Sequence, residues 1–181
     1  MYGVKNIVGG EQQVYEKLKN TISFNVHCCL ICIVQKFDKQ RMTVDVQPVI
    51  RERYINDKGE YSFINFPLLI NVPVVFPCSG ESLITFPIKQ GDECIVIFSD
   101  LAIDNWFINS GIQNPVEVRR HDLSDGIAIF GIRSLPKVVS GYEEDKIVLK
   151  LGNSSLKVSN NSIEASSNSF TWNGKTILTE A

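Results

Sequence analysis

A repeat with a period of seven residues fills the C-terminal part of the chain. From Leu149 its blocks read LKLGNSS, LKVSNNS, IEASSNS, FTWNGKT and a final ILTEA. Apolar residues stand at the first and third positions, two apart, so they share one face of a strand and do not form the seam of a coiled coil. The last four positions carry Gly, Ser, Asn, Thr or Lys, which are typical of turns. Each block therefore predicts a three-residue strand followed by a tight turn.

The apolar face of this repeat needs a cover that the repeat itself does not provide. Strands this short are unstable alone, and a single sheet of them leaves one face bare. Stacked repeats bury such a face on neighbouring units or on other chains. We therefore predict an intertwined trimeric β-helix or β-prism needle over residues 146–181, in which three copies close around an apolar axis. Its predicted core comprises Leu149, Leu151, Leu156, Val158, Ile163, Ala165, Phe170, Trp172 and Ile177.

The length and composition fit one compact domain followed by this appendage. The chain has 181 residues and a net charge of -2, which gives no reason to expect binding to nucleic acid. The longest purely apolar run, residues 28–34, is seven residues long. A membrane-spanning helix needs about 20 apolar residues, and no secretory signal is recognised at the N-terminus. We expect a protein that is made and assembled in a reducing cytosol.

The cysteines do not indicate a disulfide framework or a metal site. An odd number of them, five, stands in a chain with no recognised export signal. Cys29 and Cys32 have C-x-x-C spacing, which can serve redox or metal chemistry. A zinc site needs a second such pair or a pair of histidines, and the sequence has neither. We interpret both as small buried hydrophobes in the strand VHCCLICIV, and we expect no metal and no cofactor.

The region before the repeat is predicted to be all-β apart from a short N-terminal helix. In the N-terminal segment 1–24, the spacing of Val14, Leu18 and Ile22 predicts an amphipathic helix over residues 11–20. Within the domain 25–135, alternating or continuous apolar runs predict strands over residues 26–34, 42–47, 66–76, 83–88, 93–98 and 127–132.

Two of these strands carry further expectations. The even-numbered residues from Phe66 to Phe76 are predicted to share one face, and KQGD is predicted to join strands 83–88 and 93–98 as a hairpin-like turn. Several short strands and one small helix suggest a barrel of the OB type, with a two-sheet sandwich as the alternative. Residues 136–145 are interpreted as a linker.

Few residues suggest bond chemistry. His121 stands beside Asp122 and Asp125 in HDLSDG, a cluster that could serve acid–base catalysis, although Asp and Ser before a strand commonly hold turns. No Ser or Cys lies in a nucleophile motif, so we predict that the chain is not an enzyme. Trp106 could stack on a sugar, which leaves an oligosaccharide-binding module on a trimerising stalk as the alternative function.

The order of motifs resembles a known family over about residues 25–135. TVDVQPVI, then FPLLINVPVVFPCSGESLITFPIKQGDECIVIFSDLAIDNW, then RRHDLSDGIAIFGI is similar to the N-terminal domain of phage membrane-puncturing spikes, the gpV-like central spikes of contractile-tail baseplates. The resemblance implies an OB-fold and a C-terminal needle in which three chains intertwine. It also implies a virion or tailocin-like particle, hub and baseplate partners, and contact with the target cell envelope when the sheath contracts.

The end of the needle differs from that family. Some members carry a tip whose histidines bind iron, and here no histidine follows His121. The second positions of the blocks are polar and are predicted to face water, as Lys150, Lys157, Glu164 and Thr171, until Leu178 breaks the pattern. Three copies of Leu178 would form an apolar ring that needs a cover. We expect a separate tip protein or ligand to dock there, the alternative being that the three chain ends fold over one another.

Overall fold

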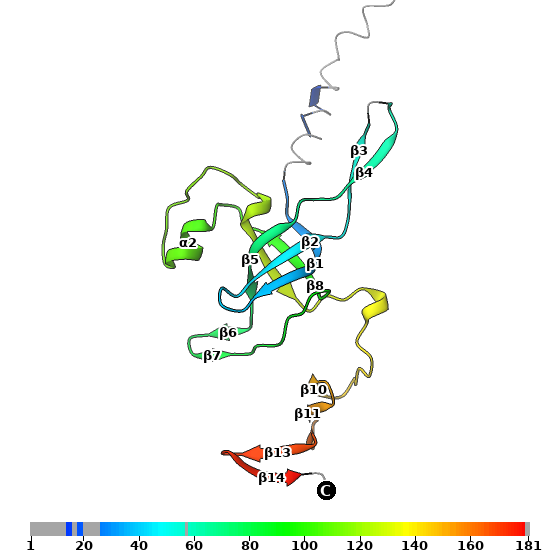
Figure 1. The fold of residues 1–181 in the computed structure, drawn as a ribbon, viewed down its shortest axis with the longest axis vertical. Helices are drawn as coiled ribbons and strands as arrows, with labels where there is room; N and C mark the ends of the chain where they lie inside the picture. The colour runs from blue at the N-terminus through cyan, green and yellow to red at the C-terminus, as the bar shows by residue number, and fades with distance from the viewer. Residues whose placement is uncertain (1–13, 16–17, 20–25, 57, 180–181) are drawn as a thin grey trace, which may run out of the picture. The chain divides into compact units, whose positions relative to one another are not determined.

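The structure is a computed structural model that describes residues 14–15, 18–19, 26–56 and 58–179 (Figure 1). It divides into two compact units, Met1–Leu135 and Pro136–Ala181. The helix predicted over residues 11–20 lies mostly outside the described residues; those of it that are described are helical and exposed. No helix within the described ranges is long and apolar enough to cross a membrane.

Five strands of the N-terminal unit close a barrel. In order around it they are β1 (Cys29–Asp38), β2 (Thr43–Pro48), β5 (Leu69–Val75), β9 (Gly126–Phe130) and β8 (Glu93–Phe98). All neighbours are antiparallel except β5 and β9, which are parallel. A five-stranded barrel with this order is OB-like. The all-β prediction is therefore confirmed for this unit, and the alternative of a two-sheet sandwich is wrong.

Smaller elements stand on the connections between the barrel strands. They are the hairpins β3 (Glu52–Ile55) with β4 (Tyr61–Ile64) and β6 (Cys78–Ser79) with β7 (Ser82–Leu83), the helix α2 (Asp104–Asn109) and the 3-10 turn η2 (Leu123–Asp125). A second 3-10 turn, η3 (Leu135–Lys137), follows the last barrel strand. The hairpin β3–β4 and the helix α2 were not expected from the sequence. Figure 1 shows the hairpin above and to the right of the barrel and α2 to the left of it.

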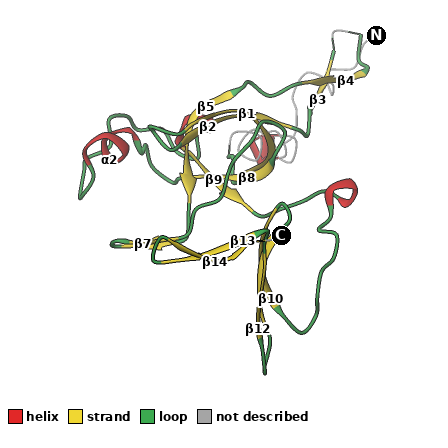
Figure 2. Cartoon of the chain, turned by 60° about the horizontal axis from the view of Figure 1, so that its bottom comes forward, coloured by secondary structure: helices red, strands yellow, loops and turns green. Residues whose placement is uncertain are grey.

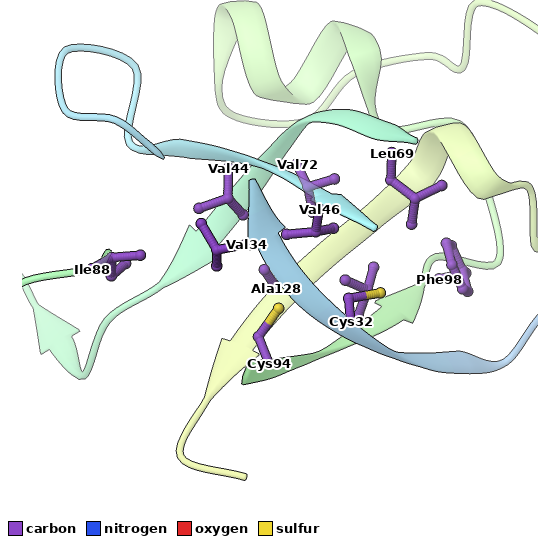
Figure 3. Packing of buried hydrophobic residues seen from close by; sticks show 11 residues of the cluster. Cys32, Val34, Val44, Val46, Leu69, Val72, Ile88, Cys94, Phe98 and Ala128 are labelled. Atoms are coloured by element: carbon purple, nitrogen blue, oxygen red, sulfur yellow. The ribbon is translucent and has the colours of Figure 1, made fainter. Parts of the chain in front are cut away.

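The barrel core is built from small and β-branched side chains (Figure 3). On β1, β2 and β8 the buried hydrophobic residues are two apart, as the pleat of a strand requires. The buried hydrophobic residues are Cys32, Val34, Val44, Val46, Leu69, Val72, Ile88, Cys94, Val96, Phe98 and Ala128. Because the interior of a five-stranded barrel is narrow, short side chains such as those of valine, cysteine and alanine fill it without voids.

The two cysteines of the C-x-x-C pair have different surroundings. Cys32 is buried and its Cα is paired with that of Cys94 on β8, whereas Cys29 is exposed. Burial raises the pKa of the Cys32 thiol to about 12 and that of Cys94 to about 11. The interpretation as buried hydrophobes is therefore right for Cys32 and wrong for Cys29, because one side of β1 faces the barrel interior and the other faces outward.

The alternation predicted for β5 is wrong in the first half of the strand. Val72 is buried, but so is Leu69, while Ile70 is 64% exposed. Asn71 adopts a left-handed conformation with φ of 54° and donates its backbone N–H to the Asp45 carboxylate at 2.9 Å. The pairing of β2 with β5 shifts at this point. An extra residue of this kind is a β-bulge, which moves every preceding side chain to the other face.

The strand predicted over residues 83–88 is also wrong, since β7 ends at Leu83. Ile88 nevertheless packs into the core. The KQGD turn is present: the backbone N–H of Lys89 donates to the Asp92 carboxylate at 2.7 Å. It does not join two paired strands, because the residues before it are not in a strand. The turn contacts β1 instead, where Gly91 donates its N–H to the carbonyl of Val34 at 2.9 Å. A proline at position 87 has no N–H to offer a ladder, which disfavours a strand here.

The repeat of the C-terminal unit folds into antiparallel strands (Figure 2). β10 (Ile147–Leu151), β11 (Ser154–Val158) and β12 (Ile163–Ser166) form one sheet, and β13 (Ser169–Trp172) pairs with β14 (Lys175–Thr179). The strands have four or five residues instead of the predicted three. Asn173 and Gly174 both have positive φ, as a two-residue hairpin turn requires. The structure contains one chain, so the trimeric needle stays a prediction.

Gly126, the first residue of β9, leaves no room for a side chain against the neighbouring strand β8. A Cβ at this position would lie 2.7 Å from Val96 Cγ1 and 3.4 Å from Phe98 Cε1, and both neighbours are buried. We expect Gly126→Ala to lower the free energy of unfolding by about 1–3 kcal/mol because the core must shift. Urea denaturation measures this loss. The double variant Gly126→Ala with Val96→Ala lacks the clashing methyl group, so its loss of stability should be smaller than the sum of the losses of the two single variants. Additive losses would contradict the clash.

Candidate functional site

The sheet of the C-terminal unit collects its apolar side chains on one face. Residues that are directly paired across antiparallel strands project on the same side. Leu149 is paired with Leu156, and Val158 is paired with Ile147 on one neighbour and Ile163 on the other. This apolar face comprises Ile147, Leu149, Leu151, Leu156, Val158, Ile163 and Ala165. Ile147 also belongs to this face, although it was not among the predicted core residues. It stands two residues before Leu149, and this spacing could have identified it.

The apolar face is exposed in the single chain. Ile163 and Ile147 are 74% and 72% exposed, and even on the central strand Leu156 and Val158 are 39% and 37% exposed. Soluble proteins rarely leave so many adjacent large apolar side chains in water unless the surface is a contact site. The register therefore makes this face a candidate contact surface.

The opposite face of the same sheet has charged partners. Lys157 Nζ donates to Glu143 at 2.6 Å, and Lys146 Nζ lies 3.3 Å from Glu143 and 3.4 Å from Glu164. The hydrogen bond from Lys157, with a smaller effect of Lys146, holds the pKa of Glu143 below its ordinary value. Residues 143–145, interpreted as part of a linker, thus contribute a side chain that contacts the polar face. Within the described residues, charged groups on the polar face have partners, whereas the apolar face has no covering segment.

The last hairpin carries the aromatic members of the repeat. Phe170 and Trp172 are two apart on β13 and are 40% and 65% exposed. Leu178, predicted to lie at the tip, is the Cα partner of Phe170. Ile177 lies where the register of the hairpin shifts. The side chains of Ile177 and Leu178 are outside what the structure describes, so their predicted roles in the needle core and in tip docking stay predictions.

In the HDLSDG motif, Asp125 holds neighbouring segments of the barrel unit together. Its side chain is fully buried, and its carboxylate accepts hydrogen bonds from Arg119 Nε at 2.7 Å, Arg119 Nη2 at 2.9 Å and the backbone N–H of Ile103 at 2.9 Å. Arg119 also forms ion pairs with Asp104 and Glu117. The hydrogen bonds to Asp125 raise the pKa of the Arg119 guanidinium above its ordinary value. This cluster ties the start of α2 to the start of β9.

His121 is not brought together with Asp125. Its Nε2 lies 3.2 Å from Asp100 Oδ1, and its backbone has a left-handed φ of 48°. Asp122 accepts the backbone N–H of Ser124 at 2.9 Å, and this bond lowers the pKa of Asp122. The carboxylates of the motif thus support a turn and an ion pair. In the part of the chain that the structure describes, no group of three or more His, Cys, Asp or Glu residues could hold a metal ion.

A groove of about 520 Å³ lies between β5 and α2. It is lined by Arg41, Pro67, Leu68, Leu69, Ile70, Asn71, Pro73, Ile103, Asp104, Phe107, Ile108, Leu123 and Ser124. The bulge at Asn71 is what turns Ile70 outward into this lining. Trp106, the predicted sugar-stacking residue, is 48% exposed on α2 and does not line the groove.

A comparison with protein families assigns the barrel. The model of the phage protein Gp138 N-terminal domain matches residues 30–131, from the second residue of β1 to the residue after β9. No curated protein matches the chain. The matched region is more than half of the sequence and supports a structural role in a phage particle. The chain therefore belongs to the Gp138 N-terminal domain family of phage proteins.

Proposed function

We propose that this protein is the central spike of a contractile-tail baseplate, in a phage or a phage-tail-like particle, and that it acts as a homotrimer. The observation that carries the proposal is the uncovered apolar face of β10–β12. Three copies of this sheet, each with its apolar face inward, form a closed prism with a dry interior and a charged exterior. The family assignment supports a place in the phage particle.

The proposed work of the spike is mechanical. On sheath contraction the needle is driven into the envelope of the target cell, so it needs stiffness and no bond chemistry. Close-packed apolar interiors have low compressibility, and interlocked strands supply the rest of the rigidity. If the five strands of the repeat stack along the needle axis, the needle is roughly 24 Å long at the usual strand spacing of about 4.8 Å.

The proposed partners follow from the same arrangement. The barrels sit beneath the tail-tube hub, and the end of the needle near Leu178 receives a separate tip protein.

Two copies that stack their apolar faces as a sandwich would also hide the apolar residues of β10–β12. Light scattering of the full chain separates the two arrangements, because it measures the mass of the complex directly, and a dimer or a monodisperse monomer would contradict the proposed spike.

Truncation tests whether the repeat is what assembles the chain. A variant that ends at Ser140 retains the barrel and the contacts of Ser134 with the Glu93 carboxylate at 2.6 and 2.7 Å. We expect it to fold with the circular dichroism of a β protein and to be monomeric by light scattering, because its core is complete without the C-terminal unit. A truncated chain that is unfolded would contradict the independence of the barrel. One that remains trimeric would contradict assembly through the repeat.

A further inference from the structure

Two cysteines lie opposite each other inside the barrel although they are far apart in the sequence. Cys32 on β1 and Cys94 on β8 are Cα partners in the antiparallel pairing of these strands. Both are free and 0% exposed, whereas Cys28, Cys29 and Cys78 are exposed. Because directly paired residues project to the same side, both thiols reach into the narrow interior of the barrel (Figure 3).

The kind of strand pairing sets the distance between these two residues. Val34, two residues after Cys32, donates its backbone N–H to the carbonyl of Asp92 at 2.9 Å, and Asp92 stands two residues before Cys94. Hydrogen-bonded pairs recur at every second residue, so Cys32 and Cys94 also form one, with Cα atoms about 5.5 Å apart. A disulfide needs a Cα separation of roughly 4.4–6.8 Å, so the observed register allows a bridge without a rearrangement of the strands.

The thiol of Cys32 is held in place only weakly. Its Sγ lies 3.7 Å from the carbonyl oxygen of Leu30, to which the S–H group donates a weak hydrogen bond. Rotation about one side-chain torsion, χ1, releases this contact and turns the sulfur toward β8. Burial, and after it the nearby Cys94 thiol, raises the pKa of Cys32 to about 12, so the two thiols are close enough to influence each other.

We propose that Cys32 and Cys94 form an oxidation site, at which hydrogen peroxide converts the two thiols into a disulfide that links β1 to β8. The thiolate of Cys94 attacks one peroxide oxygen; an S–O bond forms, the O–O bond breaks, hydroxide leaves, and Cys94 becomes a sulfenic acid. The Cys32 sulfur then attacks the sulfenic sulfur; the S–S bond forms, the S–O bond breaks, and the hydroxyl group leaves as water with the Cys32 proton. In sum, two thiols are oxidised and one hydrogen peroxide is reduced to two waters.

The order of these steps follows from the surroundings of the two thiols. Burial raises the pKa of Cys94 to about 11 and that of Cys32 to about 12, so Cys94 has the larger thiolate fraction and reacts first. A close-packed interior admits a small oxidant more readily than a bulky one. In a reducing compartment both residues stay as thiols, and the site responds when the chain meets an oxidant. The proposal goes beyond the proposed spike and does not depend on it.

The bridge is expected to stabilise the barrel. It would close a loop that contains every element from β2 to β7, and a cross-link across a long loop restricts the unfolded chain. We expect oxidation to raise the midpoint of urea unfolding of the full chain by roughly 1 M or more. Dithiothreitol, which reduces the disulfide, should return the midpoint to its original value.

Thiol labelling of the full chain tests the site. The substitutions Cys28→Ser, Cys29→Ser and Cys78→Ser remove the exposed thiols and leave only the two buried ones. This variant is incubated with hydrogen peroxide, both in buffer and in urea just below its unfolding midpoint, and is then unfolded and labelled with a maleimide-linked polymer. We expect that neither thiol is labelled, that the intact mass falls by two hydrogen atoms, and that dithiothreitol restores both labels.

The matched control moves one thiol along the same strand. In the same background, Cys94→Ala with Val96→Cys places the second thiol two residues further along β8, at another buried position on the same face. Its distance from Cys32 is that of a diagonal pair, about 7–8 Å, which is beyond the reach of a disulfide. We therefore expect no bridge in the control.

The possible results separate clearly. Thiols that stay free under both conditions, or that are oxidised further without a bridge, overturn the oxidation site. Equal yields of disulfide in the variant and in the control overturn it as well, because the bridge would then not depend on the pairing of Cys32 with Cys94. A disulfide that forms without raising the urea midpoint overturns the stabilising link between β1 and β8.

Discussion

We expect Val158→Asp to convert the proposed trimer into a monomer. Val158 occupies the middle of the apolar face, paired with Ile147 and with Ile163. In the single chain its side chain is 37% exposed, so one copy tolerates a carboxylate there. Three carboxylates brought together around a dry axis would lose their hydration and repel one another, and both effects destabilise the assembled state. Light scattering at several protein concentrations measures the loss.

The matched control places the same charge on the other face. Lys150 is exposed on β10 and is paired with Ser155, so Lys150→Asp should leave the chain trimeric. Lys157 would be a poor control: it was predicted simply to face water, but its ammonium group contacts Glu143 at 2.6 Å. Monomers from both variants would mean that the face is wrongly assigned. Trimers from both would mean that this sheet is not the interface.

Replacing Arg119 with methionine will destabilise the barrel by about 3 kcal/mol. This value is the lower end of the range for breaking a buried ion pair, and we choose it because the Arg119 side chain is itself 20% exposed. The variant leaves the fully buried Asp125 carboxylate with the Ile103 N–H and without a counter-charge. Urea denaturation of the chain that ends at Ser140 measures the change without interference from assembly.

Two further variants show whether the loss comes from the buried charge. Arg120, the next residue, pairs with Asp100 at 2.8 Å, and both side chains are largely exposed at 61% and 65%. Arg120→Met should change the stability by no more than about 0.5 kcal/mol. Adding Asp125→Asn to Arg119→Met should recover part of the loss, because it removes the unpaired charge. Equal effects at Arg119 and Arg120 would contradict the burial of the ion pair.

Features that depend on local alternation were accessible from the sequence. The strand β8 was predicted with its observed bounds, and the first and third positions of the repeat blocks do share a face on β10–β12. Each of these rests on a period of two within a few residues, and cross-strand pairing preserves it. The closed barrel followed because short strands with little helix have few other ways to hide their edges.

Features that depend on distant partners were not accessible. The bulge at Asn71 is stabilised by Asp45 from another strand, and nothing in the local pattern reveals it. Arg119 was visible only as one of two adjacent basic residues, although it contacts a buried carboxylate and fixes α2. The hairpin β3–β4 was missed because apolar side chains on both faces remove the alternation that identifies an exposed strand.

The polar face of the repeat has a consequence for how copies align. Because every block repeats the same apolar pattern, sliding one chain along another by seven residues would still place mostly apolar residues against apolar residues. The charges on the outer face would be affected by such a slip. At seven-residue steps it carries Glu143, Lys150, Lys157 and Glu164, so its sign changes at the first step and again at the last. A slip changes which charges of neighbouring copies lie at the same height, so the outer face distinguishes alignments that the apolar face alone would accept.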